Sequence, residues 1–172
     1  MTSRNAIPGA TTRAEPGGLR PAAIVLGLGL GGFFDGIVFH QLLQWHHMLS
    51  STTPVDTVAG LQLNTLFDGL FHGATWILTV VGLWLLVGAA RGGLPLESGR
   101  TFVGGILAGW GAFNLVEGLV DHYLLGIHHV RPGPDEALWD LAFLAWGALF
   151  AAAGWWLLRA SPARRQEGLR RP

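Results

Sequence analysis

The sequence contains no cysteine, and its only methionines are Met1 and Met48. The lack of cysteine excludes thiolate metal ligands and disulfides, and two methionines are too few for a thioether relay that carries Cu(I). Charged residues make up only 13% of the chain, whereas 50% of it is hydrophobic. This composition excludes an ordinary soluble domain and predicts a membrane protein. The formal net charge is zero, and no basic patch is interleaved with aromatic residues, so nucleic acid is not expected as a partner.

The chain does contain one motif twice. Residues 35–47 have the sequence Asp-Gly-Ile-Val-Phe-His-Gln-Leu-Leu-Gln-Trp-His-His, and residues 117–129 have the sequence Glu-Gly-Leu-Val-Asp-His-Tyr-Leu-Leu-Gly-Ile-His-His. Both follow the pattern acid-Gly-x-x-x-His-x-Leu-Leu-x-x-His-His, and each lies in the second half of a long apolar run. Ionisable side chains inside a membrane span are costly, so the two copies indicate a functional site.

Four apolar segments are each long enough to cross a bilayer, which takes about 20 residues as a helix. The expected fold is all-α, an integral membrane four-helix bundle, because no strict period-2 alternation supports a membrane barrel. The expected boundaries are a disordered tail at residues 1–20, a membrane domain at residues 21–158 and a basic tail at residues 159–172. Within the membrane domain, the expected spans are residues 21–47, 61–90, 101–130 and 136–158.

The four spans form two tandem two-helix repeats. Residues 66–68 resemble residues 138–140, and residues 80–86 resemble residues 152–158. Parallel repeats of this kind are related by an axis along the membrane normal, so the two histidine motifs are expected to face a shared centre. His72 has Leu144 at its counterpart position, which predicts an asymmetric site.

The arginines predict the orientation in the membrane. All of them except Arg131 fall on one side of the predicted spans, so the positive-inside rule places both termini in the cytoplasm. The histidine-rich ends then face outward, which in a bacterium is the periplasmic side of the inner membrane. The expected partners are the lipid bilayer and a small-molecule substrate or a metal donor on that side, and an oligomer is compatible with the sequence.

Helical spacing divides the polar residues between faces. At about 100° per residue, His40 and His47 share one face of the first span, whereas Asp35 and His46 share another. The second span carries a polar stripe at spacings of three and four residues, formed by Asn64, Asp68, His72, Thr75 and Thr79. Such stripes are too costly to face lipid and are expected to converge inside the bundle.

Clustered carboxylates and imidazoles favour a transition metal ion, here Zn, Fe or Cu. The residues expected to bind the metal, or to support its ligands, are His40, His72, His122, Asp35, Asp68, Glu117, His47 and His129. Among them the three histidines at 40, 72 and 122 are the expected inner ligands. The pairs His46-His47 and His128-His129 fit a second site, a route for metal entry or a pH-sensitive rim.

Several functions remain open. A metalloenzyme would activate water or oxygen, with Glu117 or Asp121 as the general base. A metal carrier, a sensor or an assembly factor for a respiratory oxidase would need exchangeable ligands instead. Haem bound by two facing histidines is a third option, which the adjacent acids disfavour. Polar side chains that only hold membrane helices together are the structural alternative.

Three stretches carry a family resemblance, namely residues 35–50, 68–72 and 114–131. They resemble bacterial four-helix membrane proteins that are catalogued as a domain of unknown function. The resemblance covers about residues 21–158. It implies a multi-pass protein of the bacterial inner membrane.

Overall fold

The computed structural model describes residues 18–91 and 98–160. Its elements are α1 (Leu19–Asp35), η2 (Gly36–Leu42), α2 (Val58–Arg91), α3 (Ser98–Glu117), η3 (Gly118–Leu124) and α4 (Glu136–Arg159), where η denotes a short π-helix that continues the preceding α-helix. The described chain is therefore all-α, as expected. Most of the two predicted tails lies outside the described residues.

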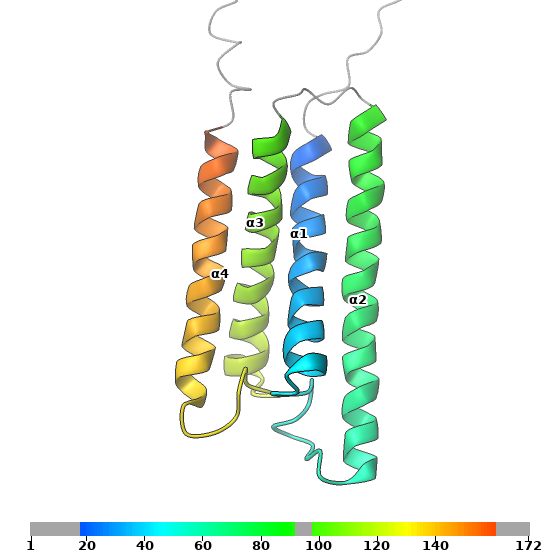
Figure 1. Cartoon of the computed structure of the whole chain (residues 1–172), viewed down its shortest axis with the longest axis vertical. Helices are drawn as coiled ribbons and strands as arrows, with labels where there is room; N and C mark the ends of the chain where they lie inside the picture. Colours follow the sequence, from blue (N-terminus) through cyan, green and yellow to red (C-terminus); the bar gives the residue numbers. More distant parts are fainter. Residues whose placement is uncertain (1–17, 92–97, 161–172) are drawn as a thin grey trace, which may run out of the picture.

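The helices stand side by side in a bundle with α1 and α3 at its centre (Figure 1). α2 packs against α1, and α4 packs against α3. The start of α1 and the end of α4 lie at the same end of the bundle, and the loops that follow η2 and η3 lie at the other end. Both copies of the histidine motif therefore sit at one end of the molecule.

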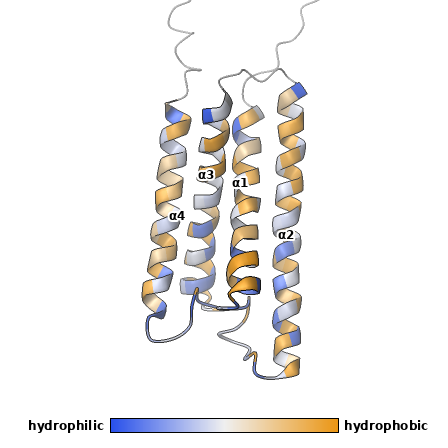
Figure 2. Ribbon diagram, in the orientation of Figure 1, coloured by the Kyte–Doolittle hydropathy of each residue, from blue (hydrophilic) through white to orange (hydrophobic). Residues whose placement is uncertain are grey.

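All four helices are long and apolar enough to cross a membrane, over Leu19–Leu42, Val58–Arg91, Gly99–Leu124 and Glu136–Arg159. Two of them end earlier than the sequence analysis expected, so residues 43–47 and 125–130 lie in loops instead. Hydrophobic residues cover much of each helix along its length (Figure 2). The largest fully buried side chains are polar, whereas Leu124 and Val58 are 77% and 75% exposed. Apolar outer surfaces around a polar interior suit a lipid environment.

Glycines let the central helices touch. A Cβ atom on Gly109 of α3 would collide with the carbonyl oxygen of Ile24 on α1, and one on Gly27 would collide with the carbonyl oxygen of Ile106. Small residues at such positions allow membrane helices to pack backbone against backbone. The close α1–α3 contact brings the two histidine motifs together at the ends of these helices.

Each motif winds as a π-helix from the glycine that follows its acid. Bonds from Leu43 N to Val38 O and from Leu125 N to Val120 O, both 2.8 Å, close the last π-turns. A π-helix forms its hydrogen bonds between residues five apart, so each residue turns by less than in an α-helix and residues five apart come closer to one face. The α-helical spacing used above was therefore wrong for this segment: Asp35 does not lie on a different face from His40 but faces it, with Oδ2 3.1 Å from Nε2.

Candidate metal centre

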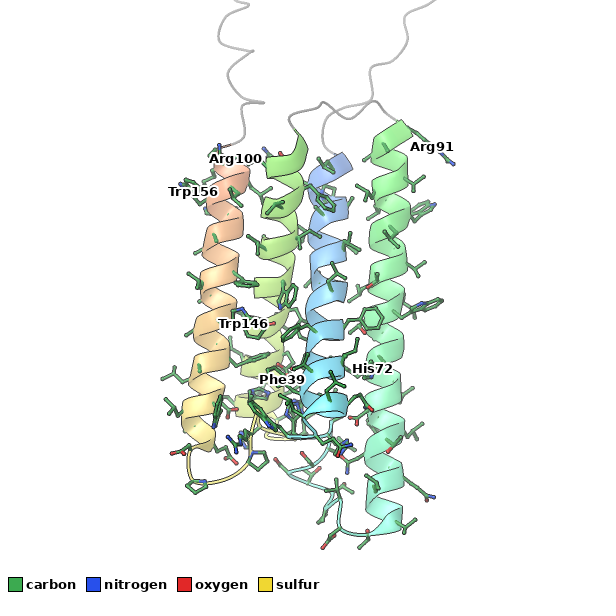
Figure 3. The ribbon with its side chains drawn as sticks, in the orientation of Figure 1. Phe39, His72, Arg91, Arg100, Trp146 and Trp156 are labelled. Atoms are coloured by element: carbon green, nitrogen blue, oxygen red, sulfur yellow. The ribbon has the colours of Figure 1, made fainter. Side chains whose placement is uncertain are left out.

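Four imidazoles meet at the end of the bundle near Phe39 and His72 (Figure 3). His40 and His122 come from the π-helices η2 and η3, and His46 and His128 come from the loops that follow them. The ring centroids are 4.4 Å apart for His40 and His46, 4.7 Å for His46 and His128, and 4.9 Å for His122 and His128. All four residues are at most 2% exposed, so they form a water-excluded core.

The Nδ1 atoms of His40 and His122 point at carboxylates of the flanking helices. His40 Nδ1 lies 2.8 Å from Oδ1 of Asp68 on α2, and His122 Nδ1 lies 3.3 Å from Oδ1 of Asp140 on α4. A carboxylate orients the ring and keeps the Nδ1 proton, which leaves Nε2 free to bind a metal. Each half thus places a carboxylate beside its motif histidine, but only Nδ1 of His40 is hydrogen-bonded to it, and Nδ1 of His122 has no hydrogen-bond partner among the described residues.

The loop histidines are held by backbone carbonyls. His46 Nδ1 donates to the carbonyl oxygen of Val130 over 2.8 Å, and His128 Nδ1 donates to the carbonyl oxygen of Met48 over 3.1 Å. Because a carbonyl only accepts, these bonds place the proton on Nδ1. The Nε2 atom of His46 then turns its lone pair toward the cluster, whereas Nε2 of His128 is hydrogen-bonded to Oε1 of Glu117 over 2.9 Å. Each loop is fastened to the other.

Several atoms inside the cluster are buried without a hydrogen-bond partner among the described residues. They are Oδ2 of Asp35, Oε2 of Glu117, Nε2 of His40, His46 and His122, and Nδ1 of His122. An unsatisfied buried polar group costs about 1–3 kcal/mol, so a set of them calls for an explanation. Glu117 Oε1 also lies 3.1 Å from Nε2 of His122. Two ligands of one ion, each about 2.0–2.2 Å from it, have a similar separation.

Two sets of three residues bring one ligand atom each within 4.8 Å of one another. They are His40, His46 and His128, and Glu117, His122 and His128. His128 belongs to both sets. Imidazole and carboxylate donors in this number and spacing can hold Zn, Fe or Cu.

A second layer surrounds the cluster. The other carboxylate oxygen of Asp68 lies 2.6 Å from Nδ1 of His47, and that of Asp140 lies 2.7 Å from Nδ1 of His129. The side chains of His47 and His129 are 15% and 23% exposed. Each aspartate therefore connects one buried imidazole with one at the rim.

A family model described as "predicted membrane protein (DUF2243)" matches residues 22–161. The chain belongs to this family. The match confirms the resemblance noted in the sequence, and it agrees with the four candidate spans in showing a multi-pass membrane protein. Neither a curated protein nor a solved structure matches the chain.

In this member of the family, His72 lies apart from the two sets of candidate ligands among the described residues. Its Nδ1 is 2.7 Å from the carbonyl oxygen of Asp68 on its own helix. Its ring covers Gly36, where a Cβ atom would lie 2.6 Å from Nε2. Leu144 covers Gly118 in the same way, with Cδ2 at 2.8 Å, so the position also accepts an apolar side chain. The ligand role that the sequence predicts for His72 is not tested by these contacts, and the ligand set proposed below does not include it.

The sequence analysis did not include His46 and His128 among the inner ligands, because it continued the helices through them. The signal for a break was Gly126, which has φ of 58° and is typical of a residue that ends a helix. Gln44 occupies the equivalent position with φ of 51°. These left-handed residues turn the chain back, so that His46 and His128 fold over the π-helices.

His46 is the loop histidine whose surroundings favour the neutral form. Burial first, and then the nearby imidazoles of His128 and His40, hold the pKa of His46 well below its ordinary value of 6.5. A neutral imidazole has a free lone pair at Nε2. His46 is therefore ready to act as a ligand at neutral pH.

Proposed function

We propose that this protein holds a transition metal at a centre of four imidazoles and two carboxylates. The ligands are drawn from His40, His46, His122, His128, Asp35 and Glu117. The observation that carries the proposal is the convergence of buried Nε2 and carboxylate oxygen atoms that have no hydrogen-bond partner among the described residues. A cation between them would satisfy these lone pairs together.

The nitrogen and oxygen donors restrict the metal. Thiolates are excluded by the lack of cysteine, and imidazole with carboxylate suits Zn, Fe or Cu. Asp68 and Asp140 act as the carboxylates that orient ligand histidines, and His47 and His129 shield them at the rim.

The burial of the ligands favours a resident cofactor of a metalloenzyme over an exchangeable cargo. Histidines that are at most 2% exposed release an ion only when the loops open, whereas a carrier or an assembly factor needs accessible ligands. A bound metal ion would supply activation of water or oxygen. Glu117, which contacts His122 and His128, or the nearby Asp121 would act as the general base.

Haem fits the cluster less well than an ion does. A bis-histidine haem needs a slot for the macrocycle between opposed imidazoles. The rings of His46 and His128 are instead stacked, with centroids 4.7 Å apart and an angle of 10° between their planes. The imidazoles themselves fill the space that a porphyrin would need.

We place the metal centre on the periplasmic side of a bacterial inner membrane, with both termini cytoplasmic. Arg91 and Arg100 lie at the end of the helices opposite Phe39 and His72 (Figure 3), which supports this orientation under the positive-inside rule. The matching contacts of the two motifs, Asp35 with His40 and Glu117 with His122, support an origin by duplication. A substrate or metal donor would approach from the periplasm or from the bilayer.

Elemental analysis of the full-length protein purified in detergent tests the proposal. Wild-type protein should carry Zn, Fe or Cu in a fixed ratio to the chain, and mild chelation should not remove it. The double variant His40→Ala/His122→Ala should lose the metal, whereas His72→Leu, which copies Leu144, should keep it. Wild-type protein without any metal, or a double variant that binds as much as wild type, would leave only helix packing. A stoichiometric Soret band would select haem instead.

A further inference from the structure

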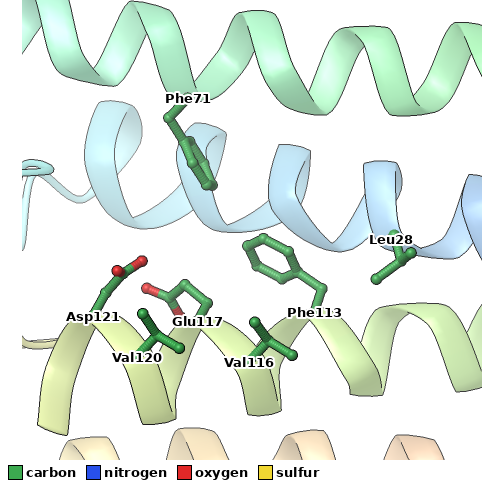
Figure 4. A pocket seen from close by; sticks show the side chains of 7 residues that line it. All are labelled: Leu28, Phe71, Phe113, Val116, Glu117, Val120 and Asp121. Carbon is green, nitrogen blue, oxygen red and sulfur yellow. The ribbon is translucent and has the colours of Figure 1, made fainter. Parts of the chain in front are cut away.

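A cavity of about 240 Å³ lies beside the metal centre, with lining residues from α1, α2, α3 and η3. Its walls are mostly apolar, and Phe71 and Phe113 face it from α2 and α3. Two carboxylates, Glu117 and Asp121, lie together at one end of it (Figure 4). The cavity is therefore a mostly apolar, partly open pocket with two carboxyl groups at one end.

Glu117 belongs to both the cavity and the metal centre. Its Oε1 lies 2.9 Å from Nε2 of His128 and 3.1 Å from Nε2 of His122. Its Oε2 is buried without a hydrogen-bond partner among the described residues, and the residue is only 5% exposed. With a metal held through Oε1 alone, a ligand in the cavity that donates a hydrogen bond would satisfy Oε2.

The equivalent position in the other half of the bundle is filled. The motif alignment puts Phe39 where Asp121 stands and Phe34 where Val116 stands. The Phe34 ring packs 5.2 Å from that of Trp110 and 5.3 Å from that of Trp146, and the Phe39 ring packs 6.4 Å from that of Phe143. Val116 and Asp121 therefore leave a space open in the second half of the chain. In the first half, the aromatic rings of Phe34 and Phe39 occupy the equivalent space.

The mouth of the cavity lies within a candidate membrane span. Val116 lines the cavity and is 62% exposed, and it lies inside the candidate span Gly99–Leu124. A ligand that enters here must dissolve in the bilayer. A phosphate or a hydrophilic metabolite would not do so.

We propose that the cavity binds the ring of a lipid-soluble phenol or hydroquinone, with a ring hydroxyl donating to Glu117 or Asp121. The volume exceeds the roughly 150 Å³ that holds a benzene molecule in an engineered cavity, so one substituted ring fits. The rings of Phe71 and Phe113 lie 6.0 Å apart at 49° and offer aromatic contacts to it. An ionised carboxylate only accepts hydrogen bonds, so a ring hydroxyl suits it as the donor.

A connection between the bound ring and the metal rests on the proposed function, because Glu117 is the residue that contacts both. Binding of the ring in the cavity does not depend on the metal, so the cavity inference and the metal-centre proposal can fail separately. A protein that carries metal but binds no hydroquinone would overturn only the cavity inference. A protein that binds hydroquinone but carries no metal would overturn only the metal centre.

The test titrates an alkyl-substituted hydroquinone into metal-loaded and metal-free full-length protein in lipid nanodiscs, followed by calorimetry. The matched ligand is its dimethyl ether, which keeps the ring and the tail but cannot donate. Tail-free hydroquinone separates a membrane-borne ligand from a water-borne one. The dimethyl ether should bind at least about tenfold more weakly than the hydroquinone, and the tail-free compound should bind more weakly when added from water.

Two variants locate the binding. Val116→Phe/Asp121→Phe copies the filled half and should abolish binding while metal content stays at the wild-type level. Leu119→Phe adds the same ring at an outward-facing position of η3 that is 54% exposed. It should change neither hydroquinone binding nor metal content. Asp121→Asn, a smaller change, should weaken hydroquinone binding more than ether binding. Absence of saturable binding, equal affinity for hydroquinone and ether, or unchanged binding in the double-Phe variant would each overturn the inference.

Discussion

His46 donates a hydrogen bond from Nδ1 to the carbonyl oxygen of Val130, 2.8 Å away and in the loop of the opposite half of the chain. The reciprocal bond runs from Nδ1 of His128 to the carbonyl oxygen of Met48. A third bond between the loops joins Ser51 N to Ile127 O over 3.0 Å. The candidate metal centre is therefore closed by two loops that hold each other's histidines in place, and both halves of the chain must be correctly packed for it to form.

The shared ligand should matter most. His128 belongs to both sets of candidate ligands, so His128→Gln should remove most of the bound metal. His72→Leu is the matched control, since Leu144 shows that an apolar side chain fits the equivalent position beside its glycine. Elemental analysis of the two variants side by side checks this, and equal metal content in both would contradict the assignment.

The orienting carboxylates should have a smaller effect than the ligands. Asp68 accepts hydrogen bonds from the rings of His40 and His47 and from the backbone N–H of Met48. Asp68→Asn keeps the shape but weakens the hold on His40, and we expect metal affinity to fall about 10–100-fold. Competition with a chelator of known affinity measures this change. A loss as complete as that of His40→Ala would make Asp68 a ligand itself.

The stability of metal-free protein should depend on pH through His46. Because the folded protein holds the pKa of His46 below its ordinary value of 6.5, the unfolded chain takes up the proton first as the pH falls. Stability should therefore be fully present above pH 6.5 and decline below it, until the pH reaches the lowered pKa in the folded state. Denaturant unfolding of chelator-treated protein at a series of pH values measures this. His46→Gln should show a shallower decline, and an unchanged slope would exclude His46 as the cause.

The contact between α1 and α3 should tolerate no added methyl group at Gly109. A Cβ atom there collides with the Ile24 carbonyl oxygen, whereas a Cβ atom on Gly88 of α2 meets nothing within 4 Å. Gly109→Ala should destabilise the protein by at least about 1–3 kcal/mol, the usual cost of overpacking, and should lower metal content. Gly88→Ala should be neutral or slightly stabilising. Detergent unfolding midpoints provide the comparison, and two equal midpoints would argue against tight α1–α3 packing.

The two left-handed residues after the π-helices should respond in opposite ways to substitution. Gly126→Ala should cost about 1 kcal/mol, although no atom lies within 4 Å of the added Cβ. Gln44→Gly should be neutral or stabilising, because a non-glycine residue already bears the strain of φ 51° there. Unfolding midpoints of both variants check this pair. A stable Gly126→Ala variant would show that the loop adopts another conformation in the membrane.

Much of this protein follows from its sequence alone. Low charge and long apolar runs predict four membrane helices, because hydrocarbon leaves no other partner for the backbone than a helix or a closed barrel. The repeated acid-Gly-x-x-x-His motif predicts that Asp35, His40, Glu117 and His122 matter, because ionisable groups are costly in lipid. Pairing α1 with α3 follows from the same repeat.

Only the tertiary structure decided which imidazoles meet. The sequence analysis assumed that each span is an α-helix over its whole length. On that assumption Asp35 and His40 lie on different faces, and His46 and His128 were not chosen as inner ligands. The π-helices and the left-handed residues Gln44 and Gly126 change that winding. They close the loops over the cluster through hydrogen bonds between histidines and carbonyl oxygens that are 80 and 84 positions apart, and such long-range bonds have no signature in local sequence spacing.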